Sequence, residues 1–482
     1  MTAPEPTAAF AAALRLHRSG EWTQALAVYD RLLGSGGCGA LAPAAYANRG
    51  AVLRRLGRLD DAVASCVEAV IRRPDLAEAY ATIGAILQES DHPVAALDAC
   101  RRAIALAPGL YTAYMALGHA FQDLGDHAQA YRALARSVDL NPTAASTRYN
   151  LAEALLQHGD FANGWRHYEA RRHLPELGFR PADPDRREWT GQDLTGRTLL
   201  VCEEQGFGDT LQFVRLLPLV KALGARIILQ CRAPLVRLLS GMAAIDAVVT
   251  AAPDDGAYDY RIPLMSLMHR LGVTLDRIPP TPDLSPPPEA TARWAGVVPP
   301  SDRLTVGLVW AGDPKLGKAN LAGMDARRSV RLDRLAPLLA LNSVGWGVGW
   351  GVRWVSLQKG PAARQLDGLP DGAAILDPMG AVEDYADTAA IVRRLDLVIG
   401  VDTSVVHLAG ALGTPVWVLS RFSGCWRWLL DRDDSPWYPT LRLFRQARPG
   451  DWDGVVERVR EELLRAVDQH RHHRHHHRRR PA

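Results

Sequence analysis

In the first third of the chain, small and apolar residues recur every 34 positions. The repeat predicts stacked pairs of helices, because small residues at fixed positions let the two helices of a pair approach and a proline ends each unit. Cys66 and Cys100 share one column of this grid, so we interpret them as core residues rather than reactive thiols. Three further columns are Tyr46, Tyr80 and Tyr114; Gly50, Gly84 and Gly118; and Pro74, Pro108 and Pro142.

After residue 198 the pattern changes to short apolar runs that alternate with helical stretches. Such alternation predicts strands connected by helices and hence parallel sheets. A proline-rich stretch at 279–300 divides the strands into two groups, so two α/β lobes are expected. The predicted strands are 198–202, 227–230, 247–250 and 260–264 in the first lobe, and 305–310, 353–357, 397–401 and 415–419 in the second.

The segment 396–419 places a buried strand, a polar elbow, a short helix and a second strand in direct succession. Asp402, Thr403 and Ser404 form the elbow, and residues of these types cap helix N-termini. In open α/β sheets ligands bind at the carboxyl ends of strands, and the free N–H groups of a helix N-terminus attract anions. Asp402 is therefore expected to hold a sugar hydroxyl, and the backbone amides that follow it are expected to bind a phosphate. The alternative is that the elbow only caps the helix and that His407 is a satisfied buried histidine.

Several segments in the last three hundred residues resemble glycosyltransferase family nine, which contains the bacterial ADP-heptose:lipopolysaccharide heptosyltransferases. In chain order they are EEQGFGDTLQF (203–213), VGLVWAGDPK (306–315), RRS (327–329), VSLQKG (355–360) and VDTSVVHLAGALGTPVWVL (401–419). A last piece, WRWLLDRDDSPWYPTLRLFRQ (426–446), resembles a subgroup in which such a domain follows tetratricopeptide repeats, whose period is also 34 residues. The resemblance implies an α + α/β chain, with an N-terminal TPR α-solenoid followed by a GT-B-type pair of Rossmann-like α/β lobes.

The turn after the first strand of the first lobe contains Gly206, Gly208 and Asp209. Glycines permit close backbone approach to a ligand, and Asp209 lies at a helix start near the carboxyl end of a strand. Taken alone, these residues fit a cap on a tight turn better than a catalytic site. The resemblance implies that Asp209 is the general base that removes the proton of an acceptor hydroxyl, with Glu203 and Glu204 as alternatives.

The second lobe carries cations directly after its strands. Cations in that position suit a diphosphate, which arginine binds in a bidentate manner, whereas a solvated basic loop is the alternative. Lys315, Arg328 and Lys359 lie inside the matching segments, and the resemblance places the nucleotide on this lobe. The predicted substrate-binding residues are Gly206, Gly208, Lys315, Arg328, Gln358, Lys359, Asp402, Thr403, Ser404 and His407.

No metal and no cofactor are expected, because the resemblance implies an inverting transfer that generally requires no metal. Asp431 and Asp433 form a DxD pattern, which we interpret as structural. Two sites depart from the family's pattern: Asp313 replaces a more usual asparagine, and the segment ending at Cys425 stands where relatives tend to carry proline and aspartate. A glycine and tryptophan tandem at 342–351 adds a predicted exposed loop.

The 482-residue chain is 48% hydrophobic, which is enough for several cores, and it has a formal net charge of +3. Its last twelve residues contribute five arginines, so the rest has a net charge of −2 and is not a basic nucleic-acid binder. The six cysteines show no CxxC spacing, which argues for reduced thiols rather than disulfides or a zinc site. Because no signal-peptide pattern and no membrane-spanning apolar run is found, the protein is expected to be cytoplasmic.

Composition and pattern together predict the domain boundaries. The last residues are so rich in histidine and arginine that they are not expected to pack. The expected parts are the repeat solenoid at 1–175, a linker at 176–197, the first lobe at 198–285, a proline-rich crossing at 286–303, the second lobe at 304–469 and a disordered tail at 470–482.

Three functions are compatible with these features. The first is a glycosyltransferase that moves a sugar from a nucleotide-diphosphate donor to an acceptor protein or peptide bound by the concave face of the repeats. The second is a non-catalytic interaction scaffold with a degenerate transferase fold. The third is another nucleotide-sugar enzyme, such as an epimerase, which leaves the repeats unexplained.

Overall fold

The computed structural model describes residues 5–34, 38–177, 187–254, 256–313, 325–343, 351–369 and 374–478. The chain divides into two compact units. The first contains Met1–Leu156 and Arg166–Phe179, and the second contains Gln157–Trp165, Arg180–Asp313 and Asp325–Ala482. Each unit is described by itself below.

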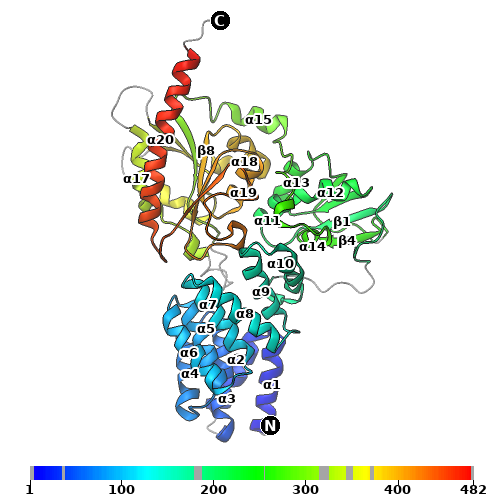
Figure 1. Cartoon of the computed structure of the whole chain (residues 1–482), viewed down its shortest axis with the longest axis vertical. Helices are drawn as coiled ribbons and strands as arrows, with labels where there is room; N and C mark the ends of the chain where they lie inside the picture. The colour runs from blue at the N-terminus through cyan, green and yellow to red at the C-terminus, as the bar shows by residue number, and fades with distance from the viewer. Residues whose placement is uncertain are drawn as a thin grey trace. The chain divides into compact units, whose positions relative to one another are not determined.

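The first unit consists of helix pairs that follow one another along the chain, drawn from blue to cyan in Figure 1. The two helices of each pair pack closely. Successive pairs also touch, since α3 contacts α5 and α5 contacts α7. The predicted helical-repeat solenoid is therefore confirmed. The helices are α1 (Pro6–Arg18), α2 (Trp22–Gly34), α3 (Ala42–Arg55), α4 (Leu59–Arg72), α5 (Ala77–Glu89), α6 (Pro93–Leu106), α7 (Tyr111–Asp123), α8 (His127–Leu140) and α9 (Ala145–Gln157).

The glycine columns of the repeat mark the places where two helices of a pair touch. A Cβ atom added at Gly50 would overlap the sulfur of Cys66, and one added at Gly84 would overlap the sulfur of Cys100. Both thiols are fully buried, and this burial raises the pKa of each to about 12. The two cysteines are core residues, as their shared column predicts.

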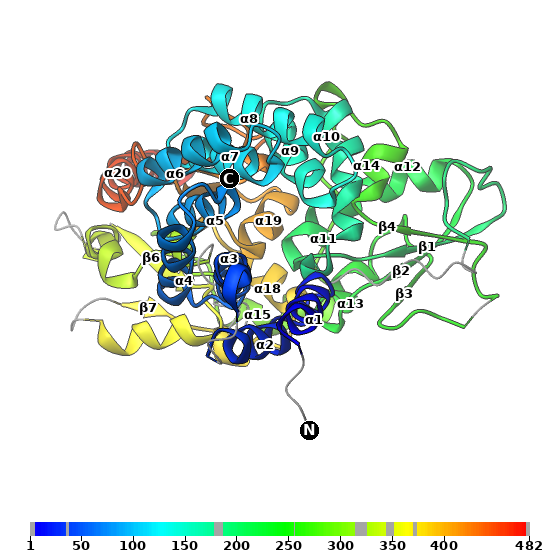
Figure 2. The same ribbon diagram turned by 90° about the horizontal axis from the view of Figure 1, so that it is seen from below.

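The first lobe of the second unit is built on a four-stranded parallel sheet in the order β3-β2-β1-β4. Figure 2 shows β1, β2 and β3 running side by side. The strands are β1 (Thr198–Cys202), β2 (Arg226–Gln230), β3 (Ala247–Val249) and β4 (Tyr260–Pro263), and the helices are α11 (Phe207–Phe213), α12 (Leu217–Ala222), α13 (Ala233–Leu239) and α14 (Ser266–Arg270).

The second lobe is built on a six-stranded parallel sheet in the order β10-β9-β8-β5-β6-β7. Its central strands β5 and β8 are buried along their whole length, which explains their continuous apolar sequences. The strands are β5 (Leu304–Val309), β6 (Val352–Ser356), β7 (Ile375–Leu376), β8 (Leu397–Val401), β9 (Val416–Ser420) and β10 (Leu441–Arg445). The helices are α15 (Pro288–Ala295), α17 (Ala336–Leu339), α18 (Tyr385–Val392), α19 (Ser404–Ala411) and α20 (Trp452–Arg478). Two parallel α/β lobes after a helical solenoid confirm the predicted fold class.

Several local features differ from the sequence prediction. Strands β7 and β10 were not expected, and β10 forms an edge of the second sheet. The segment predicted as a crossing contains helix α15, because proline at the first helical position has the backbone angle that a helix start requires. Helix α20 continues to Arg478 and so includes most of the tail that was predicted to be disordered. Residues 178–186 of the predicted linker, 344–350 of the tandem and the last four residues lie outside the described residues.

The second unit also includes the beginning of α10 (Phe161–Tyr168), which carries two aromatic side chains into its core. Phe161 stacks on Trp437 with ring centroids 5.6 Å apart, and Trp165 packs edge-on against Phe213 and Trp426. These rings form an aromatic contact between α10 and the lobes. Within the described residues, no helix is both long and apolar enough to cross a membrane.

Candidate functional site

Asp402 lies directly after strand β8, and neighbouring side chains of the second lobe hold its carboxylate. Its Oδ2 accepts a hydrogen bond from the indole N–H of Trp428 at 3.0 Å, and its Oδ1 lies 3.6 Å from Nε2 of His407. The main-chain oxygen of Asp402 accepts a further bond from Arg328 at 3.0 Å. The structure therefore brings Asp402, His407 and Arg328 together at the carboxyl edge of the sheet.

The Asp402 carboxyl stays charged although only 22% of its side chain is exposed. Burial by itself raises the pKa of this group. The hydrogen bond and charge of His407, together with the charges of Arg328 and Arg427, outweigh burial and lower the pKa to about 2. A carboxylate that keeps its charge accepts hydrogen bonds from hydroxyl groups throughout the physiological pH range.

The charge of Asp402 is expected to stabilise the fold above about pH 4 and to lose this effect below it. Its pKa is about 2 in the folded chain and about 3.9 in an unfolded one. The stabilisation is therefore complete above the unfolded value and disappears as the pH falls through the folded value. We expect Asp402→Asn to be less stable than the wild type by about 2 kcal/mol near neutral pH. Urea denaturation from pH 6 to pH 3 measures this difference, and a difference that does not shrink with acid would contradict it.

His407 is buried, and both of its ring nitrogens face protein groups. Its Nδ1 lies 3.0 Å from the hydroxyl of Tyr438, and its ring stacks on Trp428 with centroids 5.3 Å apart. Burial raises the pKa of Tyr438 to about 12, so this hydroxyl stays protonated. His407 thus orients the Asp402 carboxylate, and its satisfied, buried state agrees with the alternative that the sequence left open.

The elbow after Asp402 begins helix α19. Thr403 is its N-cap residue, and the buried Thr403 hydroxyl has no hydrogen-bond partner among the described residues. The Ser404 hydroxyl lies 2.6 Å from that of Tyr385, whose pKa is raised to about 12 by burial. Ser404 is therefore tied to α18, whereas the Thr403 hydroxyl keeps its hydrogen-bonding capacity.

The Gly206–Asp209 turn of the first lobe lies against the start of α19. A Cβ added at Gly208 would lie 2.8 Å from the His407 ring and 3.3 Å from the Cα of Ser404, so only glycine permits this approach. The Asp209 carboxylate accepts a hydrogen bond from the amide of Gly206 at 2.7 Å and forms an ion pair with Arg427 of the second lobe. The predicted base and the predicted donor site thus lie next to each other, although the base has a cationic partner.

The alternative bases are also engaged. Glu203 forms an ion pair with Arg232 and accepts a hydrogen bond from the Thr210 hydroxyl at 3.2 Å. Glu204 is 8% exposed and accepts a hydrogen bond from the Met265 amide at 2.8 Å. Both glutamates hold loops of the first lobe together, whereas Asp209 pairs with Arg427 of the second lobe.

Arg328 is fixed by the carboxylate of Asp325, which accepts bonds from its Nε at 2.9 Å and its Nη2 at 2.7 Å. A Cβ at Gly312 would overlap this ion pair, which explains the glycine in the segment that follows β5. About a third of the Arg328 side chain is exposed. Lys315 and Lys318 lie outside the described residues.

Gln358 has no hydrogen-bonding capacity left for a ligand. Its Oε1 accepts from the amides of Trp310 and Ala311 at 3.0 and 2.9 Å. Its Nε2 donates to the carbonyls of Ala311 and Lys359 at 3.0 and 2.8 Å, which uses both N–H groups. Gln358 therefore ties the ends of β5 and β6 together, and the neighbouring Lys359 is exposed, with its ammonium donating to the carbonyl of Val382 at 2.5 Å.

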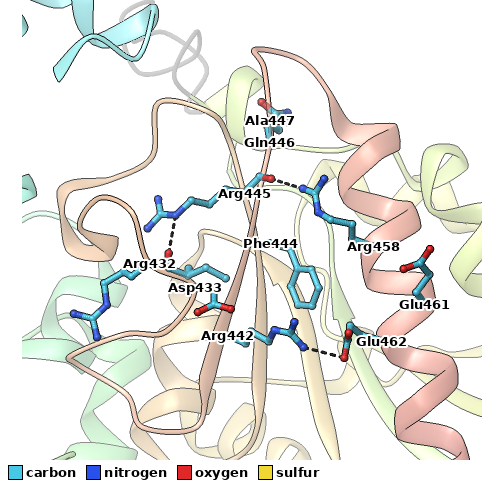
Figure 3. Close-up of a pocket in the computed structure, with 11 residues that line it drawn as sticks. Arg432, Asp433, Arg442, Phe444, Arg445, Gln446, Ala447, Arg458, Glu461 and Glu462 are labelled. Carbon is cyan, nitrogen blue, oxygen red and sulfur yellow. Dashed lines mark hydrogen bonds and ion pairs between the residues drawn. The ribbon is translucent and has the colours of Figure 1, made fainter.

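A hollow of about 490 Å³ is lined by residues of strand β10 and helix α20 (Figure 3), and Asp402 is not among its lining residues. Its arginines are engaged with neighbouring protein groups, as Arg442 is with Glu462 and Arg445 with the carbonyl of Arg432. Asp433 of the DxD pattern lines this hollow, and its carbonyl accepts from the Leu443 amide at 2.6 Å. Among the described residues, no group of three or more histidine, cysteine or acidic side chains could hold a metal ion.

The sequence reasoning missed the side chains that connect the elbow to the first lobe. They are Arg427, Trp428 and Tyr438, which follow β9 and surround Asp402, His407 and Asp209. The available signal was the piece WRWLLDRDDSPWYPTLRLFRQ, whose resemblance to a subgroup did not assign roles to single residues. Asp313 is exposed, and Cys425 accepts a hydrogen bond from Arg427 at 3.1 Å.

Comparison with known proteins identifies the repeats. A family described as tetratricopeptide repeat matches residues 10–77 and 115–170. The amino-terminal helix pairs are tetratricopeptide repeats. A solved thermophilic TPR protein from Thermus thermophilus is 20% identical, with a TM-score of 0.32, and the match covers 37% of this chain and 94% of that one.

Three other matches each cover more than half of the chain. Protein FlbA from Caulobacter vibrioides is 30% identical over 329 residues, and this match covers 62% of the chain and 52% of FlbA, so the chain spans about half the length of this curated relative. A glycosyl transferase family 9 structure from Veillonella parvula is 11% identical, with a TM-score of 0.43 and coverage of 58% and 99%. The E. coli ADP-heptose LPS heptosyltransferase II is 16% identical, with a TM-score of 0.39 and coverage of 56% and 99%.

Proposed function

We propose that this protein is a glycosyltransferase that moves a hexosyl or heptosyl group from a nucleotide-diphosphate donor to an acceptor. The observation that carries the proposal is the contact between two turns nearly two hundred residues apart in sequence. The Gly206–Asp209 turn presents one carboxylate, and the Asp402 elbow presents another beside Arg328. An acid–base group next to a sugar and phosphate site is the arrangement that glycosyl transfer to a hydroxyl requires.

In the proposed reaction, the oxygen of an acceptor hydroxyl attacks the anomeric carbon of the donor sugar. The bond from that carbon to the diphosphate breaks, and the nucleotide leaves with the electron pair. Asp209 receives the hydroxyl proton, and Asp402 accepts a hydrogen bond from the sugar. Arg328 and Lys359 balance the charge of the diphosphate, and Thr403 donates its unpartnered hydroxyl to it.

We infer that the acceptor is a protein, because tetratricopeptide repeats stack into solenoids that bind extended peptides. The repeats would recruit the acceptor and leave the choice of donor to the two lobes. Deleting the repeats should then reduce transfer to the protein acceptor without changing the affinity for the donor.

A second candidate function is an interaction scaffold that binds a nucleotide sugar without transferring it. The observation that favours it is the ion pair between Asp209 and Arg427, together with the engaged side chains of Glu203 and Glu204. A base that is permanently paired would not remove a proton from an acceptor.

A panel of nucleotide sugars tests the proposal in two steps. We expect one donor to raise the melting temperature of the full chain, since a ligand that binds only the folded state stabilises it by mass action. Incubation with that donor should release free nucleoside diphosphate, slowly with water as acceptor, and chelation by EDTA should leave the rate unchanged. Binding without any release would support the scaffold, and a folded protein that binds no donor would refute both candidates.

A further inference from the structure

The turn η10 (Trp426–Trp428) carries three successive side chains that contact three different parts of the second unit. Trp426 packs against Trp165 of α10, and Trp428 donates to Asp402. Between them, Arg427 reaches the first lobe, where it contacts Asp209 and Gln212 of α11. Arg427 is therefore the cation that links the proposed base to the elbow that carries Asp402.

The surroundings of Arg427 hold its guanidinium in a fixed plane. Only 8% of the residue is exposed, its Nε donates to Oε1 of Gln212 at 2.8 Å, and its Cζ lies 4.2 Å from the centre of the Trp426 ring. Its Nη2 points at Asp209 and its Nη1 at the sulfur of Cys425, which is a weak acceptor. An anion that replaced Asp209 would meet a preoriented fork of N–H donors.

Carboxylates and guanidinium groups of both lobes lie around this point among the described residues. Asp402 and Asp209 are the anions, and Arg328 and Arg427 are the cations whose charges both lower the pKa of Asp402. Arg328 keeps Asp325 as a second partner. A diphosphate beside Asp402 would add negative charge, and the Asp209–Arg427 ion pair is the one here that joins the two lobes.

Given the proposed function, we propose that Arg427 is a ligand of the donor diphosphate and exchanges Asp209 for it when the donor binds. The free protein keeps Asp209 masked, and donor binding releases the carboxylate to act as base. The exchange would let Asp209 act as a base only when the donor is bound. It also explains why the proposed base forms an ion pair with Arg427 in the free protein.

Binding of ADP, UDP and GDP to the full chain tests the exchange without requiring turnover. Asp209→Asn removes the anion that competes for Arg427, so we expect about tenfold tighter binding of the accepted diphosphate. Arg427→Met should weaken the same binding about tenfold or more. The double variant should match Arg427→Met alone, because without the guanidinium Asp209 has nothing to compete for.

Arg293→Met is a matched control, because Arg293 also pairs with carboxylates, namely those of Glu383 and Asp387. We expect this variant to bind the diphosphate with wild-type affinity. If Arg427→Met does not fold, Arg427→Lys retains the charge and should bind more weakly than the wild type because it lacks the fork. A wild-type protein that binds no nucleoside diphosphate would refute the proposed function itself. Binding that Asp209→Asn leaves unchanged or weakens would refute only the exchange.

Discussion

Replacing Asp402 by alanine is expected to weaken binding of the donor sugar nucleotide about 100-fold or more. The substitution removes the proposed charged acceptor for the sugar and leaves the Trp428 indole and the His407 ring without this partner. A hydrogen bond to a charged group contributes about 1.5–3 kcal/mol, and the upper end of this range corresponds to about a 100-fold change in affinity. Isothermal titration calorimetry with the donor found in the panel measures the effect.

Asp433→Ala is the matched control for this experiment. Asp433 is an exposed aspartate of the same lobe, and it belongs to the DxD pattern that a metal-dependent enzyme would use. We expect this variant to bind the donor with wild-type affinity. If Asp433→Ala lost affinity and Asp402→Ala kept it, the donor would bind at the hollow over β10 and the proposed site would be wrong.

Replacing Trp437 by alanine is expected to destabilise the second unit by about 3–5 kcal/mol, the range seen for removal of a large buried side chain. Trp437 is 1% exposed and stacks on Phe161 of α10, while its edge contacts Phe213 of α11. Its indole N–H also donates to the carbonyl of Arg427 at 2.9 Å. The substitution therefore leaves a cavity where α10 meets both lobes and frees the turn that carries Arg427.

Urea denaturation followed by far-UV circular dichroism measures this loss, with the transition of the second unit fitted separately from that of the repeats. Trp437→Phe keeps an aromatic ring but loses the indole hydrogen bond, so we expect a cost of about 1 kcal/mol. Leu219→Ala removes a side chain that is 41% exposed and should change stability by less than about 0.5 kcal/mol. Equal effects of Trp437→Ala and Leu219→Ala would show that the aromatic contact does not stabilise the unit.

Asp402 and Gln358 show what a position in the sequence says about a candidate site residue and what it leaves open. Asp402 was assigned from its position after an apolar strand, and the structure places its carboxylate in a polar, charge-balanced setting. Gln358 lies in the same kind of position, yet its amide is fully used by backbone groups. Both side chains follow buried strands, so their sequence contexts are alike. Only their neighbours in space show that the Gln358 amide has no hydrogen-bonding capacity left for a ligand.

The sequence by itself determined the repeats, the alternation of strands and helices, and the residues at the ends of the strands. These features depend on local periodicity and on residues such as Gly50 and Cys66, which recur at a fixed separation within one repeat. Only the tertiary structure decided that Arg427 pairs with Asp209 and that the Gly208 turn lies against α19. These contacts join residues about two hundred positions apart, and no local pattern encodes which charged side chain will find which partner once the two lobes have packed.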